Sequence, residues 1–128
     1  QPDLRILLFT GDGDTLMSLG SIATVANHPV TNLTIMVMDN ESYVETGSQP
    51  TATAGKTDLE IVAKGSGISN SYTIKNEKDY DRIIKTIYEE EGPSLVVAKC
   101  QVKATPLVFP HSFDGSVSIN RFMSTLKS

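Results

Sequence analysis

Two apolar segments near the start of the chain, separated by one helix-like segment, constrain its fold most strongly. Residues 4–10 and 33–38 are near-continuous apolar runs, which is the pattern of parallel strands covered on both faces. Between them, residues 15–27 carry apolar side chains at helical spacing, and a proline then ends the pattern. A strand, a helix and a strand in this order predict a right-handed βαβ unit, and hence an α/β fold.

The rest of the chain continues the alternation of helices and strands. We expect most of residues 41–57 to form a loop, which is long for a compact domain and therefore points to function. The elements expected after it are a short helix capped by Thr57-Asp58, a strand at residues 71–74, a helix opening at Asn76, a strand at residues 94–102 and a short helix around residues 119–126. This order predicts one α/β domain with a mainly parallel sheet over residues 1–128.

Composition excludes several classes of partner. The chain has 11 Lys+Arg against 15 Asp+Glu and no basic run, so no nucleic-acid surface is expected. No apolar stretch approaches the ~20 residues that cross a bilayer. The single cysteine, Cys100, cannot form an internal disulfide, and we expect it in a strand of a cytoplasmic protein.

The start of the chain lies unusually close to its first strand. Gln1 precedes that strand by three residues, there is no initiating Met, and a buried parallel strand usually has other elements before it. The sequence therefore predicts the C-terminal piece, or one subunit, of something longer, with a sheet that lacks its first elements.

Short polar groups follow both of the first two strands. Gly11-Asp12-Gly13 comes after the first strand and Asp39-Asn40 after the second, with 26 residues between Gly13 and Asn40. A βαβ crossover brings the ends of its two strands to the same edge of the sheet, where ligands of such sheets bind. Glycines allow close approach of a ligand, the first amides of a helix favour anions, and carboxylate and amide oxygens suit Mg²⁺. The pattern predicts a site for Mg²⁺ carrying a diphosphate.

These motifs resemble the diphosphate-binding domain of thiamine diphosphate enzymes. The segment Asp39-Asn40-Glu41-Ser42-Tyr43 and the following Thr46-Gly47-Ser48-Gln49 are similar to the branch that holds sulfopyruvate and phosphonopyruvate decarboxylases. The C-terminal Asp114-Gly115 and Arg121-Phe122 are similar to the end of that branch. The resemblance implies a three-layer α/β/α fold and a part in a thiamine diphosphate-dependent 2-oxoacid decarboxylase, a carboxy-lyase.

The resemblance also implies roles for individual residues. Asp12 and Asn40 would bind Mg²⁺ through their side chains and Ser42 through its backbone carbonyl. Tyr43 would flank the cofactor, and Thr46 would face the substrate as the one candidate catalytic residue. The segment that would bind the diphosphate, mainly through backbone amides, comprises Gly11, Gly13, Asp14 and Thr15.

The chain departs from the family pattern at two positions, and neither the family's activating glutamate nor the apolar residue that bends the cofactor has a counterpart in it. The family more often has a small residue at position 14, whereas Asp14 would repel a diphosphate, and it commonly has Asn where Asp39 stands. In the family, the glutamate that activates the cofactor comes from a different domain. The resemblance therefore implies a partner, a pyrimidine-binding domain or subunit that supplies this glutamate, in a homo- or hetero-oligomer.

Two other functions remain open at this point. The segment Asp12-Gly13-Asp14-Thr15-Leu16 resembles the start of haloacid dehalogenase-like phosphatases, in which the first Asp accepts a phosphoryl group. The second is a non-catalytic regulatory or assembly module that binds the cofactor poorly, and the acidic Asp14 is consistent with it. Dinucleotide and calcium-loop motifs fail, because Leu16 and Met17 stand where they need glycine.

Overall fold

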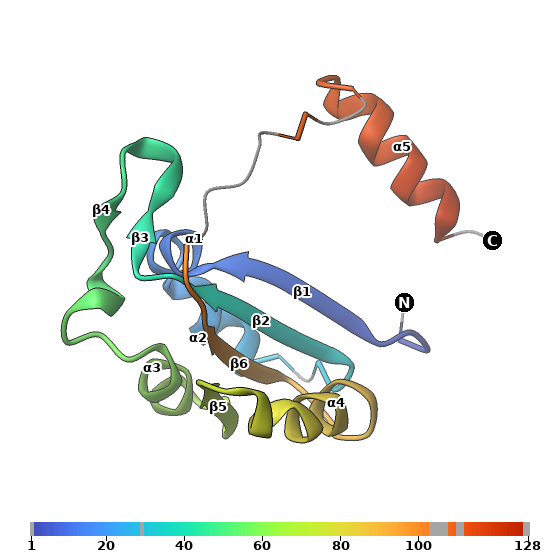
Figure 1. Cartoon of the computed structure of the whole chain (residues 1–128). Coiled ribbons are helices and arrows are strands. Elements are labelled where there is room, and N and C mark those ends of the chain that lie inside the picture. Colours follow the sequence, from blue (N-terminus) through green and yellow to red (C-terminus); the bar gives the residue numbers. More distant parts are fainter. Residues whose placement is uncertain (1, 29, 103–107, 110–111, 127–128) are drawn as a thin grey trace.

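The centre of the molecule is a parallel sheet of four strands. The computed structural model describes residues 2–28, 30–102, 108–109 and 112–126. The strands lie in the order β1-β2-β6-β5, and every neighbouring pair is parallel (Figure 1). Their bounds are β1 (Ile6–Gly11), β2 (Leu33–Asp39), β5 (Asn70–Ile74) and β6 (Ser94–Lys99).

The predicted βαβ unit is present, but its helix is broken in two. Helix α1 (Asp12–Met17) begins directly after β1, and α2 (Gly20–Ala26) leads back towards β2. At the break, the hydroxyl of Ser18 donates to the Asp14 carbonyl at 2.7 Å, a local bond of the kind that bends helices. Gly20 follows, and glycine is unfavourable inside a helix. The first helix therefore begins at Asp12, three residues earlier than the spacing of apolar residues predicts, and Asp12 and Gly13 lie in its first turn.

Helices cover both faces of the sheet and make three layers, as expected. On one face, α1, α2 and α3 (Leu59–Ser66) pack on a core that includes Val37, Leu95 and Val97. On the other face, α4 (Tyr80–Tyr88) packs Ile83 and Ile87 on a second core around Tyr72 and Val96.

The caps of α3 and α4 follow the sequence signals. Asp58 accepts a hydrogen bond from the amide of Ile61 at 3.1 Å, and Gly67 ends α3 with a φ of 113°. Asn76 caps a 3₁₀ turn, η3 (Glu77–Asp79), that runs directly into α4.

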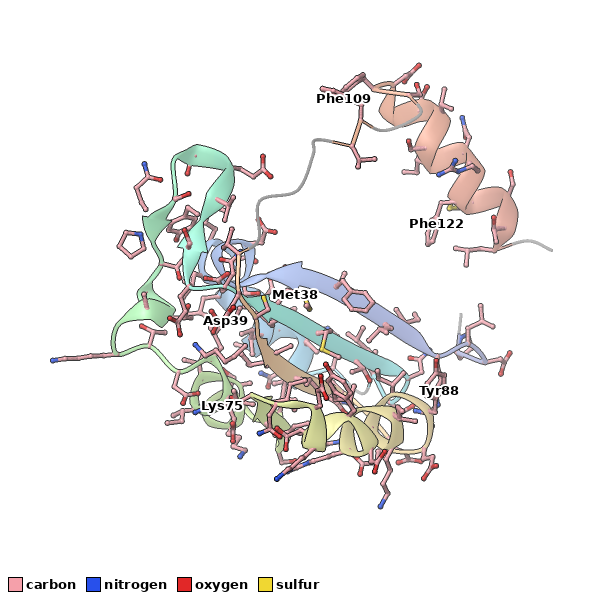
Figure 2. All side chains as sticks on the ribbon, viewed as in Figure 1. Met38, Asp39, Lys75, Tyr88, Phe109 and Phe122 are labelled. Carbon is pink, nitrogen blue, oxygen red and sulfur yellow. The ribbon has the colours of Figure 1, made fainter. Side chains whose placement is uncertain are left out.

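The expectation that the first strand is central and buried is wrong. Within the described part of the chain, β1 pairs with β2 alone and forms an edge of the sheet. Leu8 is 49% exposed and Phe9 is 62% exposed. The apolar run indicated a strand correctly, but α4 covers the sheet over β5 and β6 and leaves Phe9 and Met38 open to solvent (Figure 2).

The segment predicted as a loop carries regular structure. Strands β3 (Ser42–Tyr43) and β4 (Gln49–Pro50) form a small antiparallel pair. The 3₁₀ turn η1 (Val44–Thr46) joins them, and a second turn, η2 (Ala52–Ala54), follows β4. Short strands of this kind leave no alternation of apolar and polar residues that a sequence could show.

The C-terminal elements differ in their bounds from the prediction. β6 ends at Lys99, so Cys100 lies outside the strand and is exposed. Helix α5 (Gly115–Thr125) begins four residues before the predicted start, because Asp114 caps it through the Ser116 amide at 2.9 Å. None of the helices in the described ranges is long and apolar enough to span a bilayer.

Candidate functional site

A pocket opens where β1 and β2 end, at the edge of the sheet that the βαβ topology predicts. It has a volume of about 270 Å³ and lies between the first turn of α1 and the start of the β3–β4 hairpin. The residues lining it are Gly11, Asp12, Gly13, Asp14, Met17, Asn40, Ser42, Tyr43, Val44, Glu45 and Thr46. The structure thus brings together all the predicted site residues except Thr15.

Gly13 and Tyr43 form one wall by close contact. A Cβ atom at Gly13 would lie 2.7 Å from Cε1 of the Tyr43 ring, a separation that real carbon atoms do not adopt. The glycine therefore lets an aromatic ring lie directly on the backbone of α1. This contact joins the β3–β4 hairpin to the strand-to-helix turn.

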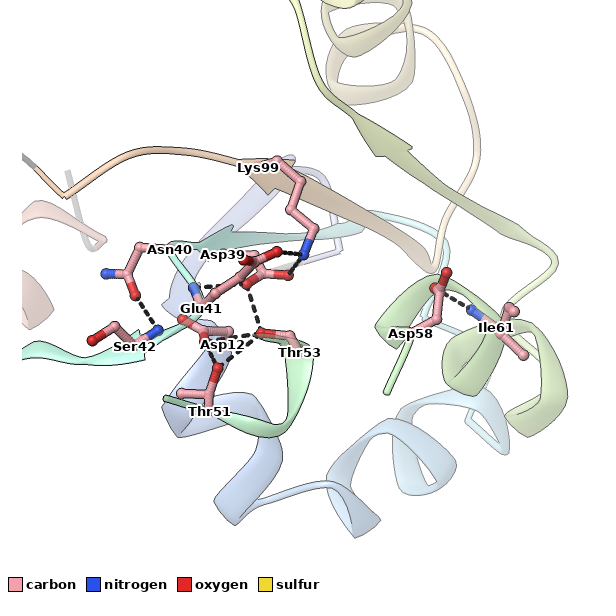
Figure 3. Close-up of polar contacts among 10 residues, drawn as sticks. All are labelled: Asp12, Asp39, Asn40, Glu41, Ser42, Thr51, Thr53, Asp58, Ile61 and Lys99. Carbon is pink, nitrogen blue, oxygen red and sulfur yellow. Dashed lines mark hydrogen bonds and ion pairs between the residues drawn. The ribbon is translucent and has the colours of Figure 1, made fainter. Parts of the chain in front are cut away.

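Asp12 is a buried carboxylate without a cationic partner. It is 2% exposed, and its Oδ2 accepts hydrogen bonds from the hydroxyls of Thr51 at 2.5 Å and Thr53 at 3.2 Å (Figure 3). No ion pair reaches it from any residue that the structure describes. Burying an unpaired charge costs on the order of several kcal/mol. A divalent cation at this position would supply the missing charge, so Asp12 fits the role of a metal ligand.

Asp39 is equally buried but has its counter-charge within the chain. Lys99 Nζ lies 2.8 Å from Asp39 Oδ2 and 2.7 Å from Glu41 Oε1. Burial lowers the pKa of Lys99, but the hydrogen bonds to the two carboxylates outweigh this effect and hold that pKa above its ordinary value. The acid at position 39 is therefore matched by a lysine at the end of β6.

A tight turn places Asn40 and Ser42. Asn40 Oδ1 accepts a hydrogen bond from the Ser42 amide at 2.9 Å, and an amide oxygen retains a second lone pair for a cation. Between them, Glu41 adopts a φ of 61°, the left-handed region that is costly for residues other than glycine. The Glu41 amide donates to Asp39 Oδ1 at 3.1 Å, so the Asp39–Lys99 pair also holds this turn.

Two sequence-predicted residues are engaged in local contacts. Thr15 is buried, and its hydroxyl donates to the Gly11 carbonyl at 2.7 Å, so its side chain does not line the pocket. Thr46 lines the pocket, and its hydroxyl lies 3.3 Å from Oε1 of Gln49. In the described part of the chain, no three His, Cys, Asp or Glu side chains converge as a metal centre. A cation here would therefore need amide, carbonyl or ligand oxygens besides Asp12.

Sequence reasoning missed three residues that support the site, namely Thr51, Thr53 and Lys99. Thr53 Oγ1 lies 2.8 Å from Asp39 Oδ1 and 2.9 Å from Thr51 Oγ1, so these side chains connect both buried aspartates. For Lys99, the sequence signal was its alternation with apolar residues at the end of a predicted strand, which did not indicate a contact with Asp39. Thr51 ends the segment of residues 45–51, which resembles the decarboxylase branch, but no pattern links either threonine to Asp12, which lies 39 and 41 residues away.

Comparisons with known proteins identify the family of this chain. Residues 1–98 match the family model of the thiamine pyrophosphate enzyme, C-terminal TPP binding domain. The chain is 33% identical over 95 residues to the sulfopyruvate decarboxylase subunit beta of Methanocaldococcus jannaschii, and the match covers 74% of this chain and 50% of that subunit. It is 35% identical over 91 residues to the phosphonopyruvate decarboxylase of Streptomyces viridochromogenes, over 71% of this chain and 23% of that protein.

A solved structure supports the fold. The transketolase of Campylobacter jejuni superposes with a TM-score of 0.57 at 16% identity, over 76% of this chain and 15% of that chain. The present chain thus spans half the length of the archaeal subunit and a smaller part of the other relatives. With the family match over residues 1–98, the chain belongs to the family of thiamine pyrophosphate enzyme C-terminal TPP binding domains.

Proposed function

We propose that this chain binds thiamine diphosphate through Mg²⁺, with the Asp12 carboxylate as the central protein ligand. The observation that carries the proposal is the burial of Asp12 without any cationic partner among the described residues, beside a second buried aspartate that has one. The Asn40 side-chain oxygen and the Ser42 backbone carbonyl complete the set of protein ligands. Both residues line the same pocket as Asp12, which supports this assignment.

The remaining pocket residues would hold the cofactor. The amides of Gly13 and Asp14 open α1 beside the glycine turn, and the segment from Gly11 to Thr15 would carry the diphosphate. Tyr43, packed on Gly13, would flank the cofactor, and Thr46 at the pocket wall would face the substrate.

We further propose that the reaction is decarboxylation of a small 2-oxoacid similar to sulfopyruvate or phosphonopyruvate. When bound, thiamine diphosphate supplies an electron sink for the bond broken in decarboxylation. The names of the relatives support this substrate class, and the subunit beta of Methanocaldococcus jannaschii supports an assembly with a second subunit. That partner, a pyrimidine-binding domain or subunit, would contribute the activating glutamate.

The organisation we propose is one diphosphate-binding domain over residues 1–128 within a homo- or hetero-oligomer. The single cysteine supports a reducing compartment, and we assign the protein to the cytoplasm. The acidic balance of the chain supports a small-molecule partner and no nucleic acid.

Substitution of Asp12 tests the proposal. Isothermal titration of the assembly that this chain forms with its partner, with thiamine diphosphate and Mg²⁺, is expected to show saturable binding that requires Mg²⁺ and is lost in Asp12→Asn. Asp81→Asn, which changes an exposed acid in the first turn of α4, is expected to bind like the wild type. Absence of binding, or binding that Asp12→Asn leaves unchanged, contradicts the proposal.

One observation favours a second candidate, a regulatory or assembly module that binds the cofactor weakly. Asp14 is exposed and lines the pocket, where its charge would repel a diphosphate. Reconstitution with the partner that supplies the activating glutamate separates the two functions. Decarboxylation of a 2-oxoacid by the assembly supports the enzyme, and cofactor binding without turnover supports the module.

A further inference from the structure

Two threonines that follow the β3–β4 hairpin contact Asp12, the residue directly after β1. Thr51 and Thr53 flank the start of the η2 turn and are 4% and 6% exposed. Both hydroxyls form hydrogen bonds with the same carboxylate oxygen, Oδ2 of Asp12. In the described part of the chain, no hydrogen bond is found to the other oxygen, Oδ1. The two oxygens of Asp12 are therefore in different environments.

The hydroxyl hydrogens are too few for all of these contacts. Four contacts of 2.5, 3.2, 2.9 and 2.8 Å connect Thr51, Thr53, Asp12 and Asp39. An ionised carboxylate only accepts, and each hydroxyl has one hydrogen, so two hydrogens serve four contacts. The Thr51 hydrogen serves Asp12 in the shortest contact, and the single Thr53 hydrogen is shared between Asp39 Oδ1 at 2.8 Å and Asp12 Oδ2 at 3.2 Å. The cluster is rich in acceptors and has one cation, Lys99, which is bound to Asp39 and Glu41.

This arrangement gives the threonines a specific task. We propose that Thr51 and Thr53 are positioning residues for Asp12, which fix its Oδ2 from inside the fold and leave Oδ1 as the oxygen that binds the cation. The inference rests on the proposed function, because it concerns the metal ligand named there. Thr53 links this positioning to the Asp39–Lys99 pair, since its hydroxyl also contacts Asp39 (Figure 3).

Fixing the carboxylate has an energetic consequence for metal binding. A carboxylate held by hydrogen bonds loses little freedom when a cation arrives, and groups behind a metal ligand commonly affect metal affinity by about 10- to 100-fold. The threonines also tie residues 51–54 to the sheet edge, so the hairpin that carries Tyr43 and Thr46 is anchored at both ends. Loss of a hydroxyl should therefore weaken the metal without removing any ligand atom.

Binding of Mn²⁺, used as the probe in the presence of thiamine diphosphate, tests the inference. The free Mn²⁺ signal in electron paramagnetic resonance reports the bound fraction without any need for turnover. Thr53→Val and Thr51→Val keep the shape of the side chain and remove the hydroxyl, and we expect Mn²⁺ to bind about 10-fold more weakly or worse. Thr53→Ser, which keeps the hydroxyl, should bind close to the wild-type affinity. Thr34→Val, a buried threonine near the start of β2, is the matched control and should bind like the wild type.

The outcomes separate this inference from the proposed function. If neither the wild type nor Thr34→Val binds Mn²⁺, the proposed function fails. If the wild type binds, Asp12→Asn does not, and both valine variants bind like the wild type, only the positioning role fails. Equal weakening in Thr53→Ser and Thr53→Val also overturns the role, because the hydroxyl would then not be responsible. Should Thr53→Val not fold by circular dichroism, Thr51→Val against Thr51→Ser decides in the same way.

Discussion

At the scale of single residues, two buried aspartates of nearly identical exposure have different electrostatic surroundings. Asp39 ends β2 with Lys99 at 2.8 Å, whereas the described side chains that contact Asp12, at the start of α1, are the threonines Thr51 and Thr53. The departure from the family pattern at position 39 is therefore compensated inside the chain. The charge of Asp12 has no such counter-charge among the described residues, which is the basis of the proposed cation site.

Removal of the second acid at the pocket is expected to strengthen cofactor binding. Asp14 is exposed at the pocket wall and would repel a diphosphate, and interactions between exposed charges amount to about 0.2–1 kcal/mol. Asp14→Asn should bind thiamine diphosphate and Mg²⁺ about 2- to 5-fold more tightly by isothermal titration. Asp81→Asn serves as the control for loss of one negative charge elsewhere, and weaker binding by Asp14→Asn would contradict the expectation.

The pKa of the Cys100 thiol should depend on the nearby charges of Asp39, Asp12 and Lys99. Burial raises its pKa most, the carboxylates of Asp39 and Asp12 raise it further, and Lys99 lowers it. Alkylation by iodoacetamide requires the thiolate, so its rate should rise with a midpoint above the ordinary thiol value of about 8.5. Lys99→Gln removes the lowering charge, and its midpoint should lie at higher pH than that of the wild type. An unchanged or lower midpoint in Lys99→Gln would show that the charge of Lys99 does not lower the pKa of this thiol.

At the scale of elements, the junction between α4 and β6 supports the start of β2. The Gly92 amide donates to the Thr31 carbonyl at 2.6 Å, and a Cβ atom on Gly92 would lie 2.5 Å from the Leu33 carbonyl oxygen. The obstacle is backbone, which cannot move aside as a side chain can. In contrast, Gly65 lies within α3, and a Cβ atom there would meet open space, with no heavy atom within 4 Å outside the helix's own backbone.

These two glycines should therefore respond in opposite directions to the same substitution. Gly92→Ala is expected to lower the free energy of unfolding by about 1–3 kcal/mol, because the start of β2 must shift. Gly65→Ala should raise it by about 0.5–1 kcal/mol, because alanine favours a helix interior. Urea unfolding followed by circular dichroism measures both, and a stable Gly92→Ala protein would show that this junction is not tightly packed.

At the scale of the whole molecule, the two faces of the sheet are covered unequally. Three helices cover the face of Val37 and Val97. Among the described helices, α4 alone packs on the other face, and Phe9 and Met38 are 62% and 40% exposed. Helix α5 lies apart from the sheet (Figure 1), with Phe122 on it exposed (Figure 2). Ile119 of the same helix is also exposed. Large apolar side chains are therefore exposed both on the open face of the sheet and on α5.

Exposed apolar surface on the sheet should bind the dye anilinonaphthalene sulfonate. The double variant Phe9→Ser with Met38→Ser should lower the dye fluorescence of the folded protein, because it removes neighbouring apolar groups of one open face. Ile61→Ser is the control, since Ile61 is 67% exposed but is the only large exposed apolar residue of α3. An equal decrease in both proteins would mean that the open sheet face is not the site of dye binding.

The sequence predicted most elements and most of the pocket because those signals are local. The apolar runs indicated β1 and β2, Asp58 indicated the start of α3, and the strand ends indicated Asp12 and Asn40. The break between α1 and α2 and the small β3–β4 pair were not predicted, since they depend on single hydrogen bonds and on very short strands. The proposed ligand roles of these residues remain predictions.

The sequence by itself determined the α/β class and the meeting of two polar strand ends, because periodicity and chain order are sufficient for a βαβ unit. Only the tertiary structure decided that β1 lies at an edge and that Thr51, Thr53 and Lys99 surround the buried aspartates. Lys99 lies on β6, which pairs with β2 only after the chain has passed through two further helices and three strands. Contacts between residues so far apart depend on strand order, and no local pattern of residues specifies strand order.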